Sequence, residues 1–314
     1  MRRLWVAVLV AVSMMIGVTA SQAADYPSKP VEMLVGYKAG GLVDTMARAL
    51  AKPMEEALGQ PVVILNKPGA GGALAVTSLK GAKPDGYTIG ITTALTFTYT
   101  PYVQKVDFGL DDYTFVGSVG RFQEAFVSAP DKPWKDFKGL VEYSKKNPGL
   151  AFATMHPIGG DILQYIAKKE GIQWREIPTK GGEEVMTAIL GNHVDFGFSG
   201  GIHTSFVKAG KMIVLAGLGK ERLLASPDVP TLTEFGYGVT FVNDNIIAVP
   251  KGLPDPVKAK LASAVEKAAK DPGYIDLLQN KLVIPAVYVG GEELTGMLRE
   301  YAEFQKNLVK ALQK

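Results

Sequence analysis

The segment GYKAGGLVD (36–44) places two adjacent glycines and an aspartate between an apolar run and a helical pattern. The first N–H groups of a helix lack partners within the helix and carry partial positive charge, and glycine lets an anion come close to them. We therefore expect Gly40 and Gly41 to open a helix towards an anionic ligand. Asp44 would fall in the first helical turn and hold the loop by accepting N–H bonds. A plain helix cap is the alternative.

A second segment, TMHPIGGD (154–161), repeats this logic of strand, Gly-Gly and helix start. Two such loops would face each other across a cleft and aim backbone donors at one ligand. Between them in the chain, NKPGAGGAL (66–74) is not a dinucleotide fingerprint, because Leu74 stands at the third glycine position. It is not a phosphate loop either, since no Gly-Lys-Ser/Thr ends it. We interpret it as a tight turn near the site.

Groups for catalysis are scarce in this chain. There is no cysteine, and the three histidines, His156, His193 and His203, have no metal-ligand spacing. No Gly-x-Ser-x-Gly elbow occurs. Ser199 lies near His203 in sequence, but no orienting acid stands beside them. The sequence thus favours a binding protein without metal or cofactor over a hydrolase.

The first 23 residues have the pattern of a secretory signal peptide. Arg2 and Arg3 precede an apolar run (4–20), and small residues follow it. We expect cleavage after Ala23 or Ala24, and an uncleaved membrane anchor is the alternative. Removing residues 1–23 would leave 32 basic and 31 acidic residues, without the concentrated basic face of a nucleic-acid binder. With no cysteine for a lipid anchor, we expect a soluble protein of a bacterial periplasm.

The rest of the chain alternates between strand and helix patterns, which predicts a mostly parallel α/β architecture. Extended segments near 120 and 243 separate two such blocks, and the tail is helical. We therefore predict two α/β lobes joined by two hinge strands. Lobe one would comprise 24–122 plus 244–314 with the tail helices packed on it, and lobe two 123–243. A single continuous sheet is the alternative.

Several motifs carry a family resemblance. They are, in chain order, YPSKPVEMLVGYKAGGLVDTMAR, NKPGAGG, AKPDGYT, PTKGGEEVMTAILGNHVDF, VKAGK and SPDVPTLTEFGY. The chain resembles the substrate-binding proteins of the tripartite tricarboxylate transporter family, also called the Bug family. The resemblance implies a type II periplasmic-binding-protein fold with a closing cleft, and no catalysis. It also implies an organic carboxylate as ligand and a two-component membrane permease, driven by an ion gradient, as partner.

In that family two loops grip a carboxylate mainly through backbone N–H groups. The resemblance maps the first loop onto Tyr37, Lys38, Ala39, Gly40 and Gly41, and the second onto Thr154 to Gly160, with His156 and Gly159 among its residues. Further polar candidates at strand ends or near the hinge are Thr92, Thr93, Ser199 and Asn243.

This chain departs from the family pattern where the ligand would bind. Lys38 stands where a small residue is usual, Ala39 replaces a proline, and the second loop has His156 and Pro157 in place of serines. Further departures are Ser199, where an acid or amide is frequent, and Thr179, where tyrosine is usual. We hypothesise that the Lys38 ammonium pairs with a second negative group of the ligand, and a solvated lysine at the rim is the alternative. His156 would either donate a hydrogen bond to the ligand or only pack in its loop.

One helix start contributes only about 0.3–2 kcal/mol to anion binding, whereas micromolar affinity requires about 8 kcal/mol. Binding should therefore use both lobes and be coupled to closure. We expect a monomeric receptor that captures a di- or aromatic carboxylate and delivers it to a tripartite transporter. The alternative is a periplasmic ligand-presenting subunit of a sensory two-component system.

Overall fold

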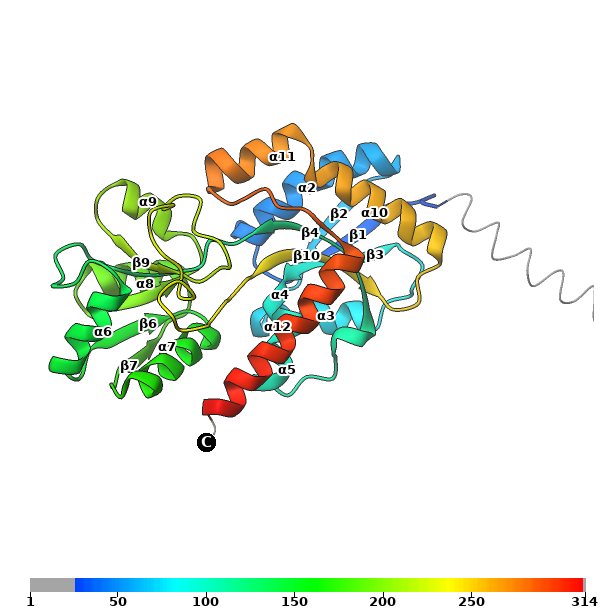
Figure 1. The fold of residues 1–314 in the computed structure, drawn as a ribbon. Helices are drawn as coiled ribbons and strands as arrows, with labels where there is room; N and C mark the ends of the chain where they lie inside the picture. The colour runs from blue at the N-terminus through cyan, green and yellow to red at the C-terminus, as the bar shows by residue number, and fades with distance from the viewer. Residues whose placement is uncertain (1–25, 313–314) are drawn as a thin grey trace, which may run out of the picture.

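Residues 26–312, the part of the chain that the computed structural model describes, form two α/β lobes, each built around its own sheet (Figure 1). The signal peptide expected over residues 1–23 lies outside the described residues. Within 26–312, no helix combines the length and the apolar character that crossing a membrane requires.

The sheet of lobe one has the strand order β11-β4-β10-β3-β1-β2. Strands β2, β1 and β3 run parallel, and β10 lies antiparallel between β3 and β4. The strands are β1 (Val31–Val35), β2 (Val62–Asn66), β3 (Thr88–Thr93), β4 (Tyr113–Arg121), β10 (Asp244–Pro250) and β11 (Val289–Gly290). Strands β3 and β10 are buried almost throughout, as expected for strands covered by helices on both faces.

Helices cover both faces of this sheet. Those of lobe one are α2 (Leu42–Leu58), α3 (Ala73–Lys80), α4 (Ala94–Thr98), α5 (Thr100–Val103), α10 (Asp255–Ala269), α11 (Pro272–Asp276) and α12 (Gly291–Leu312). Helices α2, α10 and α11 share one apolar core with the sheet, and α3, α4 and α12 share another. Helix α2 buries Met46, Leu50 and Met54, spaced as one face of a helix, and ends at Gly59 in the left-handed region (φ 74°).

The sheet of lobe two, β7-β6-β8-β5-β9, repeats this plan. Strands β7, β6 and β8 are parallel, and β5 lies antiparallel between β8 and β9. The elements are β5 (Ala125–Ser128), α6 (Phe137–Lys146), β6 (Ala151–Thr154), α7 (Pro157–Glu170), β7 (Arg175–Pro178), α8 (Gly182–Leu190), β8 (Phe196–Ser199), α9 (His203–Lys208) and β9 (Ile213–Gly217). Helices α6 and α7 pack on one face and α8 and α9 on the other.

The chain passes between the lobes twice, after β4 and before β10 (Figure 1). The two passages lie side by side, because the Phe122 N–H donates to the Asn243 carbonyl at 2.9 Å. The Arg121 guanidinium also holds both carboxylate oxygens of Asp244, at 2.8 and 3.0 Å. On this ground we propose lobe limits at 122/123 and 243/244.

Helix α12 packs on both lobes, not on lobe one alone as the sequence suggested. Leu294 and Leu298 join a core of lobe one, whereas Leu308 joins the core that α6 and α7 form in lobe two. The reason is length, since 22 residues of helix extend about 33 Å. Nearby, the Tyr99 hydroxyl donates to Asp161 of α7 at 2.6 Å, so lobe one also contacts lobe two by a hydrogen bond.

Candidate functional site

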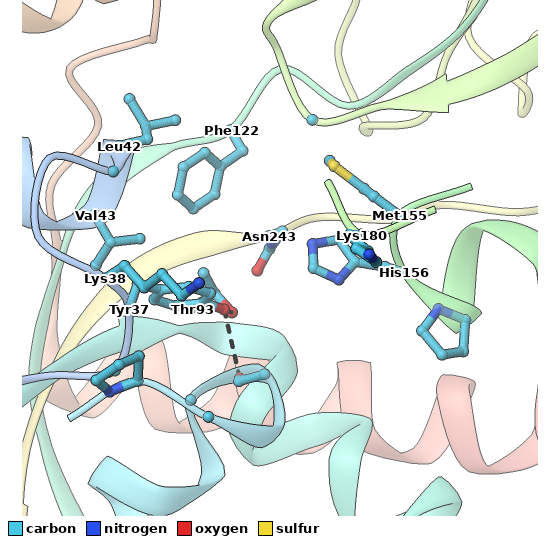
Figure 2. Close-up of a pocket in the computed structure, with 18 of the residues that line it drawn as sticks. Tyr37, Lys38, Leu42, Val43, Thr93, Phe122, Met155, His156, Lys180 and Asn243 are labelled. Carbon is cyan, nitrogen blue, oxygen red and sulfur yellow. Dashed lines mark hydrogen bonds between the residues drawn. The ribbon is translucent and has the colours of Figure 1, made fainter. Parts of the chain in front are cut away.

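A cavity of about 690 Å³ separates the two lobes, and residues of both line it (Figure 2). Figure 2 shows Tyr37, Lys38 and Thr93 on one side of this cleft and Met155, His156 and Lys180 on the other, with Asn243 between them. The residues predicted from the sequence that line the cleft are Tyr37, Lys38, Gly41, Thr93, His156 and Asn243. Those that do not line it are Ala39, Gly40, Asp44, Thr92, Thr154, Gly159, Gly160 and Ser199.

The start of α2 offers anion donors, but they are not the ones expected. The Gly40 N–H donates to Asp44 at 2.8 Å and the Gly41 N–H donates to the Lys38 carbonyl at 3.2 Å. Both groups are therefore already engaged in shaping the turn. The N–H groups of Leu42 and Val43 instead have no acceptor among residues 26–312, and both residues line the cleft. The two glycines shape the loop, and the next two residues present its donors.

Asp44 holds this loop from within the protein. Its side chain is 2% exposed and accepts from Gly40 N–H at 2.8 Å, Arg48 Nε at 2.9 Å and Asn66 Nδ2 at 2.8 Å. Burial alone would raise the pKa of Asp44, but the hydrogen bonds from Arg48, Asn66 and Gly40 hold it below its ordinary value. Asp44 is thus an ionised side chain that fixes the loop by hydrogen bonds and does not line the cleft.

Tyr37 and Thr93, the last residue of β3, line the cleft from lobe one. The Tyr37 hydroxyl lies 3.1 Å from Thr93 Oγ1 and 3.4 Å from the Gly71 carbonyl, and burial raises its pKa, so it is neutral. Thr92 is buried beneath the NKPGAGG turn, where a Cβ at Gly72 would lie 2.5 Å from its Oγ1. This contact explains why Thr92, unlike Thr93, does not line the cleft.

The second loop differs from the expectation more strongly. Helix α7 begins at Pro157, so Gly159 and Gly160 lie inside the helix and not in a loop. A Cβ at Gly159 would lie 2.7 Å from the Phe198 ring, and one at Gly160 would lie 2.3 Å from a Glu176 carboxylate oxygen. These glycines therefore allow close packing within lobe two and do not line the cleft. Thr154 is buried and donates to the same Glu176 at 2.8 Å.

The start of α7 consequently presents side chains to the cleft, not helix N–H groups. Pro157 at the first helical position has no N–H, and the Gly159 N–H donates to the His156 carbonyl at 3.1 Å. The lining side chains of this lobe include Met155, His156 and Lys180. Burial lowers the pKa of His156, which makes it a neutral imidazole. Lys180 faces the cleft from lobe two as Lys38 does from lobe one (Figure 2).

The sequence analysis missed Glu124, which lines the cleft at the first passage between lobes. Its side chain is 4% exposed, and Oε1 accepts from Asn243 Nδ2 at 3.1 Å. The other oxygen, Oε2, is buried and has no partner among residues 26–312. Burial raises the pKa of Glu124 to about 8, although the Asn243 hydrogen bond lowers it. A lone acid in the apolar hinge segment RFQEAFVSA was the signal that could have found it.

The chain is similar to known proteins. The family model for the tripartite tricarboxylate transporter family receptor matches residues 46–313. The chain belongs to this family. It is 31% identical over 300 residues to a Cupriavidus necator relative, the UPF0065 protein in the gbd 5' region, covering 93% of this chain and 90% of the relative.

Solved structures of other proteins share the fold. A TctC solute-binding protein from Polaromonas superposes with a TM-score of 0.80 at 23% identity, covering 91% of this chain and 99% of that one. The periplasmic binding protein BugD superposes with a TM-score of 0.72 at 29% identity, covering 91% and 98%. MatC from Rhodopseudomonas palustris was solved with bound malate (TM-score 0.74, 23% identity, 90% and 100% covered). Another R. palustris protein was solved with adipate (0.78, 20%, 91% and 98%).

The protein is therefore a periplasmic solute-binding protein of the TctC and Bug type, with two lobes of type II fold. The family is one of receptors and not of enzymes. A Ser–His contact among residues 26–312 agrees with this. Ser199 Oγ lies 2.9 Å from His203 Nδ1, but Ser199 is fully buried outside the cleft. Burial lowers the pKa of His203 to about 4, so this pair is a neutral packing contact.

Proposed function

We propose that this protein captures an organic carboxylate, either a dicarboxylate or an aromatic carboxylate, in the cleft between its lobes. The observation that carries the proposal is the pair of free N–H groups at Leu42 and Val43, which open onto the same cleft as Lys38 and Lys180. Helix N–H groups and ammonium groups both favour an anion. The malate and adipate bound to MatC and to the second R. palustris relative support this class of ligand.

Neither lobe suffices alone for useful affinity. Charge-assisted hydrogen bonds contribute about 1.5–3 kcal/mol each, so two N–H donors supply at most about 6 kcal/mol. Micromolar binding requires about 8 kcal/mol net of the entropy lost on association. The Lys38 ammonium adds at most one more such contact from lobe one, so the side chains of lobe two must supply the rest, which couples binding to closure of the cleft. Closure then creates the surface that a membrane permease of a tripartite, secondary-active transporter recognises.

The ligand class is tested by thermal unfolding of the protein with malate, adipate, succinate and benzoate. A ligand at 100 times its dissociation constant stabilises the folded protein by about 2.7 kcal/mol. We expect a clear rise in the unfolding temperature with at least one of these acids, and no rise with their neutral amides. No shift with any carboxylate would contradict the proposal.

The Lys38 hypothesis is tested by calorimetry on Lys38→Ala. If Lys38 pairs with a second carboxylate, affinity for the dicarboxylate should fall at least tenfold while affinity for its monocarboxylate analogue stays nearly unchanged. Lys52→Ala is the matched control, because Lys52 is also an exposed lysine of lobe one but lies on α2 away from the cleft. Equal affinity of Lys38→Ala and the control would leave Lys38 as a solvated rim residue.

Delivery to a secondary-active transporter is tested by uptake in cells. Uptake of the identified acid should require this protein and collapse with an ionophore, whereas uptake that needs only ATP would contradict a secondary-active partner.

Export and the monomeric state are tested on the purified protein. The mass of the exported protein should correspond to cleavage after Ala23 or Ala24. Sedimentation should give a monomer.

A further inference from the structure

Glu124 is the one acidic side chain that lines the cleft among residues 26–312, and no cation pairs with it there. Its Oε1 accepts from Asn243 Nδ2 at 3.1 Å, and Asn243 belongs to the other passage between the lobes. The acid therefore sits at the junction of the two passages, at the floor of the cleft. An ionised carboxylate would be costly there, because burial without a partner charge disfavours the charged form.

The unpaired oxygen of Glu124 is buried next to Gly200, a residue that lines the cleft. A Cβ built on Gly200 would lie 3.4 Å from Oε2 and 2.8 Å from Met155 Cε. Glycine at this position therefore lets the cleft lining come close to Oε2. A neutral acid carries one O–H donor, and for Oε2 no acceptor is present among residues 26–312. An anion in the cleft would supply one.

We propose that Glu124 is a specificity-determining residue of the cleft, which in its neutral form donates a hydrogen bond from Oε2 to an oxygen of the bound carboxylate. This inference rests on the proposed function, since it requires a carboxylate in the cleft. It adds a donor from the hinge to those of α2, and it makes binding depend on a proton. In this form of the cleft Oε2 is covered, so contact requires the lobes or the Gly200 loop to shift as the ligand enters.

Other ionisable groups near Glu124 must be separated from it in any test. They are Tyr37, Lys38, His156 and Lys180 in the cleft, His203 behind the Gly200 loop, and Arg121, Lys220, Glu221, Arg222 and Asp244 around a smaller cavity behind the hinge, which Glu124 also lines. The pKa of His156 is lowered and that of Tyr37 is raised, so both stay neutral from about pH 7 to 9. With a pKa of about 8, Glu124 loses its proton within that window.

The decisive experiment is calorimetry with malate, adipate, succinate and benzoate at pH 7.0 and pH 9.0, on the wild type, Glu124→Gln and Glu55→Gln. The wild type should lose about tenfold in affinity at pH 9.0, because only about a tenth of Glu124 would keep its proton. Glutamine keeps a donor and the bond from Asn243 but cannot ionise, so Glu124→Gln should bind as well as the wild type at pH 7.0 and lose much less at pH 9.0. Glu55, which accepts one N–H bond from Val62 on the far side of lobe one, is the matched control and should behave as the wild type.

The outcomes separate this inference from the proposed function. Absence of binding by every acid at both pH values would overturn both. Binding by the wild type and Glu124→Gln with equal pH dependence would overturn the inference alone. Weak binding by Glu124→Gln together with wild-type affinity that rises with pH would also overturn it, because Glu124 would then be an ionised acceptor for a cationic ligand group.

A measurement without ligand tests the neutral state of Glu124 independently. The folded protein binds this proton more tightly than the unfolded chain, whose pKa is 4.5, so stability falls as pH rises from about 4.5 to about 8. Glu124→Gln should therefore unfold several degrees above the wild type at pH 8, with a much smaller difference at pH 5. If the unfolding temperatures of Glu124→Gln and the wild type differed equally at pH 5 and pH 8, Glu124 would not be neutral in the folded protein.

Discussion

Helices α2 and α7 enter the cleft from opposite lobes, and each begins just after a parallel strand. At the start of α2, Asp44 engages the Gly40 N–H and leaves the N–H groups of Leu42 and Val43 open to the cleft. At the start of α7, Pro157 has no N–H to offer, and Ile158 is fully buried. The same strand–helix geometry therefore gives a backbone anion site in lobe one and a side-chain surface in lobe two.

This difference suggests an order of events. A preformed set of donors in lobe one can bind a carboxylate while the cleft is open, because nothing in that lobe must move. The long side chains of Lys180 and Met155 in lobe two can then adapt to the remainder of the ligand as the cleft closes. Affinity for the carboxylate would reside in lobe one and the choice among carboxylates in lobe two and at the hinge.

The largest effect on stability and affinity should come from removing the Asp44 carboxylate, which holds the loop before α2. Asp44→Ala leaves Gly40, Arg48 and Asn66 without their acceptor, and each lost bond to a charged group is worth about 1.5–3 kcal/mol before water compensates. We expect stability to fall by about 3 kcal/mol and carboxylate affinity to fall about a hundredfold. Urea unfolding and calorimetry measure the two effects.

Asp136→Ala is the matched control for Asp44→Ala. Asp136 caps α6 by accepting from Gly139 N–H at 2.7 Å, but it lies in lobe two away from the cleft. It should lose about 1 kcal/mol of stability and no affinity. An Asp44→Ala protein that binds as tightly as this control would show that the loop of lobe one does not need the Asp44 carboxylate.

A smaller effect should follow from making lobe one resemble lobe two. Leu42→Pro places a proline at the first position of α2, where the helix tolerates it, and Gly41 already has the extended backbone (φ −75°, ψ 170°) that precedes proline readily. The substitution removes the Leu42 N–H together with the leucine side chain, which packs against the core of lobe one. We expect a loss of about 10- to 100-fold in carboxylate affinity, with an unfolding temperature close to that of Leu42→Ala.

Leu42→Ala separates the side chain from the N–H group. Leu42 is partly buried against the core of lobe one, so the alanine variant should lose some stability but keep most of its affinity. If the alanine and proline variants lose affinity equally, the contact of lobe one with the ligand is apolar and the comparison between the two helix starts fails.

Much of this architecture follows from local pattern. The sequence predicted a helix opened by Gly40 and Gly41, and α2 begins at Leu42, directly after them. It predicted the two lobes because strand and helix patterns alternate in two blocks. The start of α7 was misjudged since Gly159 and Gly160 look like loop residues, although Phe198 and Glu176, distant in sequence, are what require them.

The atoms of the site were harder to predict from the sequence, because they too depend on contacts that form only in the folded protein. Whether an N–H is free depends on its nearest acceptor, and the use of the Gly40 N–H by Asp44 is visible only in three dimensions. Glu124 is conspicuous only after folding, when Asn243, more than a hundred residues later, becomes its neighbour. Patterns therefore located the loops of the cleft but not the atoms that they expose.

The smallest effect should come from the reverse exchange, Pro157→Ala, which restores an N–H at the start of α7. If lobe two contributes through side chains, an added donor there gains little, and affinity should change less than about threefold. Stability should fall by about 0.4–1 kcal/mol, because alanine leaves the unfolded chain more freedom than proline. A tenfold gain in affinity would instead show that α7 already points at the ligand's charge as α2 does, with proline as its only difference. Calorimetry with the carboxylate that binds most tightly distinguishes these outcomes. It thereby decides whether both lobes bind the ligand's negative charge, or whether lobe one binds the charge and lobe two contacts the rest of the ligand.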